Sequence, residues 1–236
     1  MKHKTDDGTE ATQIARMHAQ TYGTLAAVFN QKPDSAMVHN IKTIGVDFFA
    51  HLYRSGDLNA DVREGLTRMS HFAAQVKRQS AQDVELSLQI DWTRLFRGVQ
   101  RGYGPMPPYE GLYLGENESD FRALEVVVYF YGQHGVLPNE QAGNRPDYIG
   151  LELDFLCYVC EQQAACWEKG EEQEALSWQQ AEREFLRDHL SRWAATFCDR
   201  AIEEARTDFY CGFIHLTKGV IKDMSDTPRP VSIGKN

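Results

Sequence analysis

The segment from Asn144 to Cys160 places the strongest constraint on how this chain can fold. It opens with residues that suit a first helical turn. The side chain of Asn144 or Asp147 can accept hydrogen bonds from the exposed backbone N–H groups, and Pro146 has no N–H to leave unpaired. Apolar residues then recur at a spacing that places them on one helical face: Ile149, Leu153, Leu156 and Cys160. Further apolar side chains widen this face, so the segment is predicted to be a helix that is buried on most sides.

An acidic residue interrupts this apolar face. Glu152 lies three residues after Ile149 and four before Leu156, so its side chain belongs to the same side of the helix. A buried carboxylate without a partner is costly. Glu152 is therefore expected either to pair with a donor, such as an arginine, or to face a groove that a ligand can enter.

Apolar residues at helical spacing extend over most of the remaining chain. Residues 82–97 also alternate like a strand in their first half, but we interpret them as a helix because the chain offers no partner strand. The sequence predicts an all-α fold, a single helical bundle of about nine or ten helices. Besides the central helix, which should run to about Gly170, helices are expected at residues 10–30, 36–54, 59–76, 82–97, 119–131, 173–188, 191–206 and 207–220.

The connections between these helices are marked by glycine and proline. They gather near 98–118, which predicts a long loop of the kind that is usually functional or a domain boundary. A second, hinge-like connection is expected at 132–143. Residues 1–9 and 225–236 are expected to be flexible tails, so the helical domain should span 10–224.

The charge and the hydropathy pattern exclude several classes of function. A net charge of −9 argues against non-specific nucleic-acid binding, which needs basic patches, and is compatible with a basic partner. No stretch approaches the roughly 18 apolar residues of a membrane span. The polar start of the chain, Met1 to Gly8, has no apolar core of a secretory signal. A cytoplasmic protein without membrane insertion is therefore expected.

The cysteine pattern leaves a second class of function open. Cys157 and Cys160 are three residues apart on the central helix, and Cys166 follows, so a helical redox or metal-binding protein that uses these three remains an alternative. Their neighbours are apolar, which favours buried thiols and no metal site. The sequence contains no phosphate-binding loop and no nucleophile elbow, so we do not predict an enzyme.

The central segment also carries a family resemblance. Residues 146–156, Pro-Asp-Tyr-Ile-Gly-Leu-Glu-Leu-Asp-Phe-Leu, resemble the Pro-x-Asp-His-x-x-x-Glu-Leu-x-Phe-Met segment of the TorD/DmsD-type redox-enzyme maturation chaperones. Arg145 replaces the first proline of that pattern, and Tyr148 replaces its usual histidine. Four further blocks resemble segments of the family and keep the same order: residues 91–98, 107–114, 185–197 and 207–210. In the second block, Gly111 replaces a serine of the family pattern.

The resemblance implies an all-helical chaperone that performs no chemistry of its own. Such proteins bind the twin-arginine leader, the apo catalytic subunit, or both, of a molybdopterin-dependent oxidoreductase, and hold it for cofactor insertion before export. Weak guanine-nucleotide binding is implied as well, but no other cofactor. The expected state is a monomer or a domain-swapped dimer. An adaptor that binds a folded partner without recognising a leader remains a third interpretation.

A receptor for a twin-arginine leader needs carboxylates for two guanidinium groups and an apolar groove for the rest of the peptide. Asp147 and Glu152 supply the acids, and Tyr148, exposed at a helix start, is expected to stack on an arginine or to donate its hydroxyl. Alternative interpretations are a plain helix cap for Asp147, core packing for Trp92, Leu95 and Phe96, and loop architecture for Pro108, Tyr109 and Glu110. His189 and Trp193 are interpreted as packing and helix-end residues. The predicted leader-binding residues are Trp92, Leu95, Phe96, Pro108, Tyr109, Glu110, Asp147, Tyr148 and Glu152.

Overall fold

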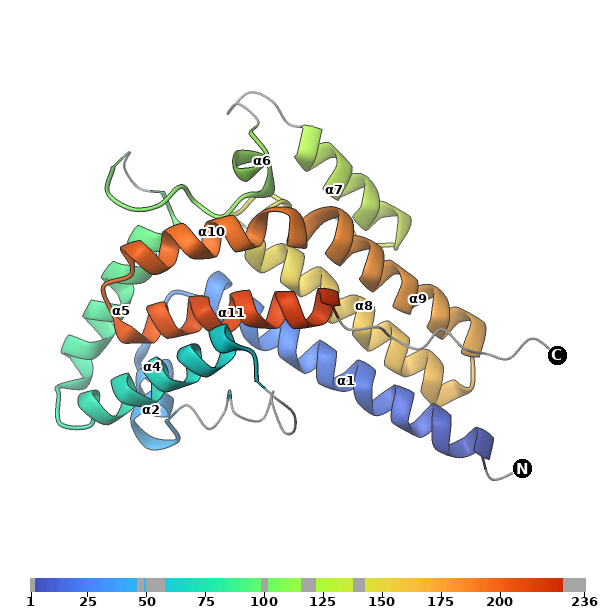
Figure 1. Ribbon diagram of the computed structural model, residues 1–236, viewed down its shortest axis with the longest axis horizontal. Coiled ribbons are helices and arrows are strands. Elements are labelled where there is room, and N and C mark those ends of the chain that lie inside the picture. The colour runs from blue at the N-terminus through green and yellow to red at the C-terminus, as the bar shows by residue number, and fades with distance from the viewer. Residues whose placement is uncertain are drawn as a thin grey trace.

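The computed structural model describes residues 3–45, 49, 58–98, 102–115, 122–137 and 143–226. Within these ranges the regular structure is helical, apart from an isolated antiparallel bridge between Tyr109 and Tyr148, so the all-α prediction is confirmed (Figure 1). The helices are α1 (His3–Asn30), α2 (Ser35–Thr43), α4 (Ala60–Val76), α5 (Ala81–Phe96), α6 (Glu110–Tyr113), α7 (Arg122–Gln133), α8 (Ile149–Lys169), α9 (Glu172–Phe185), η1 (Leu186–Leu190), α10 (Ser191–Glu204) and α11 (Asp208–Asp226).

Three helices form one side of the molecule: α1 from the start of the chain, and the consecutive helices α8 and α9. The first helix, α1, packs along the central helix α8, and α9 packs on α8 as well (Figure 1). On the other side α4 packs against α11, and α10 also packs against α11. The central helix is therefore buried on most sides, as its apolar pattern predicts.

Aromatic rings join the two sides of the bundle. Phe29 of α1 lies with its ring centroid 4.9 Å from that of Phe96 in α5 and 5.0 Å from that of Phe213 in α11. All three side chains are fully buried. A second group under α7 brings the ring of Phe155 within 4.5 Å of Tyr131 and 4.8 Å of Phe185. Such offset and edge-to-face contacts add to the free energy gained by burying the rings.

Several helix ends differ from the prediction. The first helix begins at His3, so residues 3–9 continue α1 instead of forming a separate tail. The second helix was expected to reach residue 54 but ends at Thr43, because Gly45 follows with a φ of 69°, which a helix cannot contain. The loop near 98–118 contains a short helix, α6, that was not predicted.

Some predicted features lie outside the described residues. They are most of residues 46–57, positions 99–101 and 116–118 of the long loop, the first three residues of the helix expected at 119–131, positions 138–142 of the expected hinge, and residues 227–236. The last helix ends at Asp226, two residues beyond the predicted boundary of the domain.

The C-terminal half of the bundle contains one long bent rod. The segments α9, η1 and α10 follow each other without a break, and η1 is a turn of π-helix that contains His189. A π-helical turn changes the direction in which the following side chains point and is often found at functional sites. Here His189 faces Glu110 at the start of α6, and Trp193, on the next turn, faces Glu152 at the start of α8.

Candidate functional site

The two motif segments with the clearest family resemblance pair with each other. Ile149 donates its backbone N–H to the carbonyl oxygen of Pro108 at 3.0 Å, and Glu110 donates to the carbonyl of Asp147 at 2.9 Å. This pairing makes the bridge between Tyr109 and Tyr148 and holds the start of α6 against the start of α8. Residues 108–110 and 147–149 therefore form one unit.

Asp147 does not cap the central helix, so that interpretation is wrong. The helix begins at Ile149, and Tyr148 occupies the cap position without a side-chain hydrogen bond. The fully buried carboxylate of Asp147 instead accepts the backbone N–H of Gly111 at 3.3 Å and forms two bonds to the Arg145 guanidinium, at 2.9 and 2.5 Å. Asp147 thus ties the start of α6 to the segment before α8.

Tyr148 is fully buried, which contradicts the expectation of an exposed ring. Its hydroxyl donates to the carbonyl oxygen of Phe29 in α1 at 2.9 Å, and burial raises the pKa of this phenol. Its ring centroid lies 5.4 Å from that of Tyr109, which is half-buried. The Arg145 guanidinium lies 5.0 Å from the Tyr109 ring, and the Arg97 guanidinium lies 5.8 Å from the Tyr148 ring, so each tyrosine of the pair faces an arginine of this chain.

Beneath the paired segments lies a buried acidic cluster, which we define as Glu110, Asp147 and Glu152. Glu110 is paired with Nδ1 of His189 at 3.1 Å. Oε2 of Glu152 accepts the indole N–H of Trp193 at 3.3 Å, so the donor is a tryptophan and not the expected arginine. His189 and Trp193, which the sequence marked as packing residues, are therefore polar partners of the cluster.

The buried acidic cluster changes the proton affinity of Glu152. Burial raises the pKa of Glu152 well above its usual range, and the charges of Glu110 and Asp147 raise it further. The hydrogen bond from Trp193 acts in the opposite direction. Oε1 of Glu152 has no hydrogen-bond partner within the described ranges, which is consistent with a carboxyl that keeps its proton.

Replacing Glu152 by glutamine should change how stability depends on pH. Because the pKa of Glu152 is raised on folding, the folded protein keeps this proton where the unfolded chain has released it. The stabilisation is fully present below the ordinary glutamate pKa of about 4.3 and is lost as the pH rises through the folded-state pKa. Glutamine does not titrate. In urea titrations the wild type should therefore lose stability relative to Glu152→Gln, by up to about 1.4 kcal/mol per pH unit in that window.

Glu203→Gln provides the matched control, because Glu203 is exposed on α10. The stability of this control should run parallel to that of the wild type at all pH values. A difference between wild type and Glu152→Gln that stays constant from about pH 4 to 8 would contradict a raised pKa for Glu152.

The predicted aromatic contacts lie in the core. Trp92, Leu95 and Phe96 are buried, and the Trp92 indole donates to the carbonyl oxygen of Val28 at 3.1 Å. The Arg97 guanidinium covers the Trp92 ring at 4.4 Å and lies 5.8 Å from the Tyr148 ring. The end of α5 is thus connected to the paired segments, but these three side chains present almost no surface to a partner.

A surface cavity of about 410 Å³ lies beside the paired segments, between the end of α7 and the first half of α8. None of the nine predicted residues lines it. Asp154 stands among its lining residues; partial burial raises the pKa of this carboxyl, while the Asn30 amide that donates to it at 2.7 Å acts in the opposite direction. Its apolar lining includes Val136, Leu137, Pro146, Leu151, Phe155 and Tyr158.

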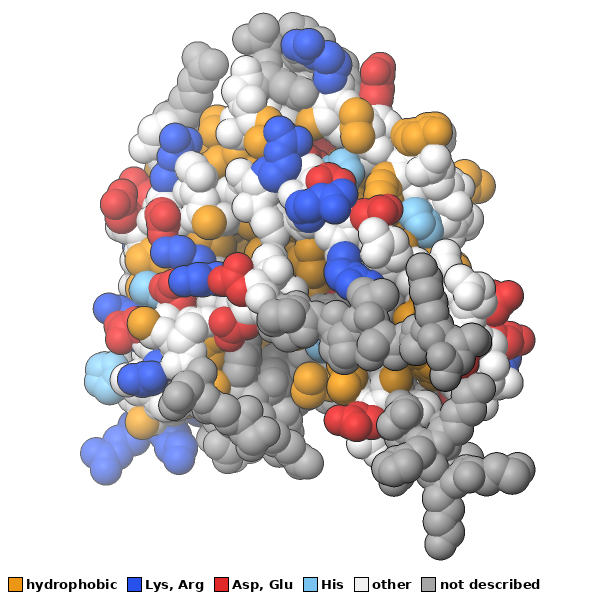
Figure 2. All heavy atoms as spheres, turned by 45° about the vertical axis from the view of Figure 1, so that its right-hand side comes forward, with side chains coloured by type: hydrophobic (Ala, Val, Ile, Leu, Met, Phe, Trp, Pro, Cys, Tyr) orange, Lys and Arg blue, Asp and Glu red, His pale blue; other side chains and the backbone are white. Residues whose placement is uncertain are grey.

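Large apolar side chains are exposed at the edge of this cavity and elsewhere on α7. Leu137 is 83% exposed, and Val126 and Tyr129 of α7 are exposed by more than half. On the face shown in Figure 2, hydrophobic side chains are visible among interspersed basic and acidic ones. Apolar surface of this kind often marks a binding site. The sequence signal for it was the unbroken apolar run of residues 126–131, because a helix that is apolar on all sides and packs on one face must expose some of these side chains.

The three cysteines of the alternative interpretation do not converge. Cys160 and Cys166 are buried and Cys157 is half-buried, all as thiols. Among the described residues, the group of metal-ligating side chains whose donor atoms converge contains Cys160 but neither of the others.

The helices in the described part of the chain lack the combination of length and apolar character that a membrane-spanning helix needs.

Comparisons with known proteins agree with the motif pattern. A family model described as "Nitrate reductase delta subunit" matches residues 55–199, more than half of the chain. A chaperone protein TorD of Vibrio cholerae serotype O1 (strain ATCC 39315 / El Tor Inaba N16961) is 24% identical over 210 residues, which cover 86% of this chain and 88% of the relative.

Two further relatives have names that specify an assembly role. A chlorate reductase assembly chaperone protein of Ideonella dechloratans is 31% identical over 123 residues, 52% of this chain and 61% of the relative. A perchlorate reductase assembly chaperone protein of Dechloromonas aromatica (strain RCB) is 25% identical over 193 residues, 77% of this chain and 84% of the relative. This chain belongs to the nitrate reductase delta subunit family, and its relatives place it among the TorD/DmsD-type chaperones of that family.

Proposed function

We propose that this protein is a cytoplasmic maturation chaperone for a molybdopterin-dependent oxidoreductase. It binds the twin-arginine leader, the apo catalytic subunit, or both, and holds the client for cofactor insertion before export. The family match over residues 55–199 carries the proposal, and the relatives named as reductase assembly chaperones support it. The protein acts by binding and catalyses no reaction. Guanine-nucleotide binding and the oligomeric state stay predictions.

The cavity between α7 and α8 is the proposed place for the leader. A twin-arginine leader combines two guanidinium groups with an apolar stretch, and the cavity combines Asp154 with an apolar lining. The net charge of −9 favours the approach of a basic peptide. Leu137, which lines the cavity and is 83% exposed, adds apolar surface at its edge.

The predicted site residues act mainly as the support of this site. Tyr109 is the member that a peptide can reach, and its hydroxyl lies 3.4 Å from Oδ1 of Asn144, which lines the cavity. The buried acidic cluster and Tyr148 hold the paired segments in place below it. Direct contact between the leader and Trp92 would require the Arg97 side chain to move away from the indole.

Calorimetric titration with a twin-arginine leader peptide tests the proposal. The wild type should bind, and Asp154→Asn should weaken binding by about tenfold, the effect of losing one charge-assisted hydrogen bond of about 1.4 kcal/mol. Changing both leader arginines to lysine should weaken binding by a similar factor, because lysine cannot form the bidentate contact. The melting temperature of the Asp154→Asn protein should stay close to that of the wild type.

Glu203→Gln is the control for Asp154→Asn, because it removes one acidic charge from an exposed position on α10. Its affinity for the leader should equal that of the wild type. Absence of heat with several leaders would contradict leader recognition. A client without its leader that still co-purifies would then support binding to the catalytic subunit, or an adaptor that ignores leaders.

A further inference from the structure

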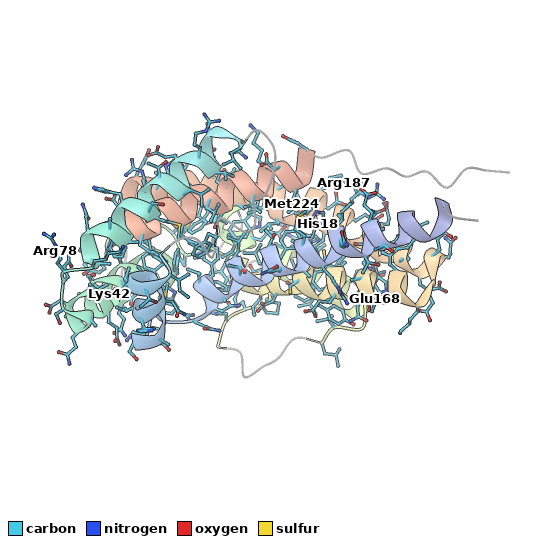
Figure 3. The ribbon with its side chains drawn as sticks, turned by 90° about the horizontal axis from the view of Figure 1, so that it is seen from below. His18, Lys42, Arg78, Glu168, Arg187 and Met224 are labelled. Carbon is cyan, nitrogen blue, oxygen red and sulfur yellow. The ribbon has the colours of Figure 1, made fainter. Side chains whose placement is uncertain are left out.

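A second group of polar residues lies farther along the central helix, between α1, α8 and α9. His18 comes from α1, Cys160 from α8 and Glu182 from α9, and all three are buried. Their potential ligand atoms lie within 4.8 Å of one another, and Nδ1 of His18 is 3.3 Å from Oε1 of Glu182. Figure 3 labels His18 on the long α1 helix, which runs beside α8. We define these three residues as the His18–Cys160–Glu182 triad.

The spacing of the triad suits a tetrahedral metal ion. Zinc binds imidazole nitrogen and carboxylate oxygen at about 2.0–2.2 Å, so two such ligands at a tetrahedral angle lie roughly 3.4 Å apart. The separation of 3.3 Å between His18 and Glu182 matches this edge. A thiolate sulfur, an imidazole nitrogen and a carboxylate oxygen also form a donor set that zinc accepts.

Charge balance also favours a divalent metal ion between the three side chains of the triad. Buried charges need a partner in a medium of low dielectric constant. A thiolate and a carboxylate contribute two negative charges, and a neutral imidazole adds none, so a divalent cation makes the whole group neutral. Binding releases the thiol proton of Cys160 to solvent, together with any second proton on the imidazole of His18.

Neighbouring side chains supply an outer shell and a fourth donor. The Tyr22 hydroxyl donates to Oε1 of Glu182 at 3.0 Å, which orients this carboxylate as outer-shell partners of metal ligands do. Gln163 follows Cys160 by three residues, so it lies beside it on α8. The Gln163 side chain is only 3% exposed, and its Oε1 has no hydrogen-bond partner in the described part of the chain. A buried acceptor without a donor is the group that a cation would satisfy.

We propose that the His18–Cys160–Glu182 triad binds one zinc-class divalent cation, with Gln163 as the fourth ligand, and that this ion clamps α1 to α8 and α9. The site is independent of the proposed leader-binding cavity. It departs from the sequence-based expectation of no metal, which considered cysteines along one helix and not partners from two others.

Cobalt(II) titration of chelator-treated protein tests the proposal, because cobalt reports thiolate and tetrahedral ligation by its absorption spectrum. We expect one equivalent per chain, with a thiolate charge-transfer band and strong visible bands that added zinc abolishes. Zinc should also raise the midpoint of thermal unfolding by about 5–10 °C when free zinc exceeds its Kd a hundredfold. Cys160→Ser should abolish the charge-transfer band and weaken binding by more than about a hundredfold, since even outer-shell changes cost 10–100-fold.

Two serine variants control for non-specific thiol binding. Cys157→Ser removes the half-buried thiol of α8, and Cys198→Ser removes a buried thiol of α10. Both should bind cobalt like the wild type. If Cys160→Ser fails to fold, Gln163→Leu and His18→Gln keep the test decisive, because each should weaken binding while the thiolate band persists at saturation. Binding below about 0.1 equivalents, a band that survives Cys160→Ser, or a melting midpoint that zinc leaves unchanged would overturn the site.

Discussion

Replacing Asp91 by alanine should lower the free energy of unfolding by about 3–5 kcal/mol, the cost of breaking a buried ion pair by removing one partner. Asp91 is 1% exposed, and its Oδ2 accepts the backbone N–H of Arg206 at 3.0 Å and that of Thr207 at 2.8 Å. The Thr207 hydroxyl donates to the same oxygen at 2.8 Å, and Arg94 donates to Oδ1 at 3.1 Å. Alanine would remove this acceptor from the buried Arg94, which keeps its ion pair with Glu204, and from the partly buried N–H and O–H groups of residues 206 and 207.

The measurement is chemical denaturation of Asp91→Ala, Asp91→Asn and Asp83→Ala. Asparagine keeps one acceptor oxygen but turns an N–H₂ toward other donors, so its loss should be intermediate. Asp83 is the control, because it is exposed in the first turn of the same helix and its removal should cost at most about 1 kcal/mol. A loss for Asp91→Ala no larger than that for Asp83→Ala would contradict the role of Asp91 as the anchor of the turn between α10 and α11.

Asp91 also shows what a local pattern can and cannot reveal. Its segment, 91–98, resembles the family pattern, and the residue in it that the sequence predicts as an aromatic contact is Trp92. The aspartate holds residues that follow more than a hundred positions later in the chain. Periodicity identifies the buried face of a helix, but it does not tell which distant backbone that face will meet.

The fold could be predicted because the signals that mark each helix, apolar spacing and capping residues, lie within the helix itself or next to it in the sequence. Apolar spacing located α4, α5, α8 and the rod from α9 to α10. The caps of α2 and α4 are local as well, since Asp34 and Asn59 each accept a backbone N–H of the following turn. The errors lie where local signals are weak. No apolar pattern requires a helix at residues 3–9, yet α1 extends through them.

The sequence predicted which segments lie together but not which of their side chains are exposed. The two motif segments do lie together, and Glu110, Asp147 and Glu152 do gather there. Tyr148 is covered by α1 through the carbonyl of Phe29, a contact between residues 119 positions apart that no spacing rule contains. The cavity residue Asp154 was missed for the converse reason, because a polar residue on a helix normally marks a plain solvated face.

Close packing of α4 on α11 gives the second large effect, a pair of alanine substitutions with opposite signs. A Cβ atom on Gly212 would lie 2.6 Å from the carbonyl oxygen of Gly65 and 2.7 Å from Cγ of Met69. A backbone oxygen cannot move aside as a flexible side chain can, so the two helices must separate. Gly212→Ala should therefore destabilise the protein by about 3 kcal/mol, the upper part of the range for overpacked cores. The melting temperature should fall by about 6–12 °C.

Gly132→Ala is the matched control on an exposed position of α7. No atom lies within 4 Å of the added Cβ, and alanine is the better helix former, so this variant should gain about 0.5 kcal/mol. The two variants add the same methyl group to a helix, and the difference between them isolates the contact with α4. Thermal and urea unfolding measure both. Equal and small effects would mean that α4 and α11 can separate without loss of core packing, which the burial of Val62, Met69 and Leu216 at this interface argues against.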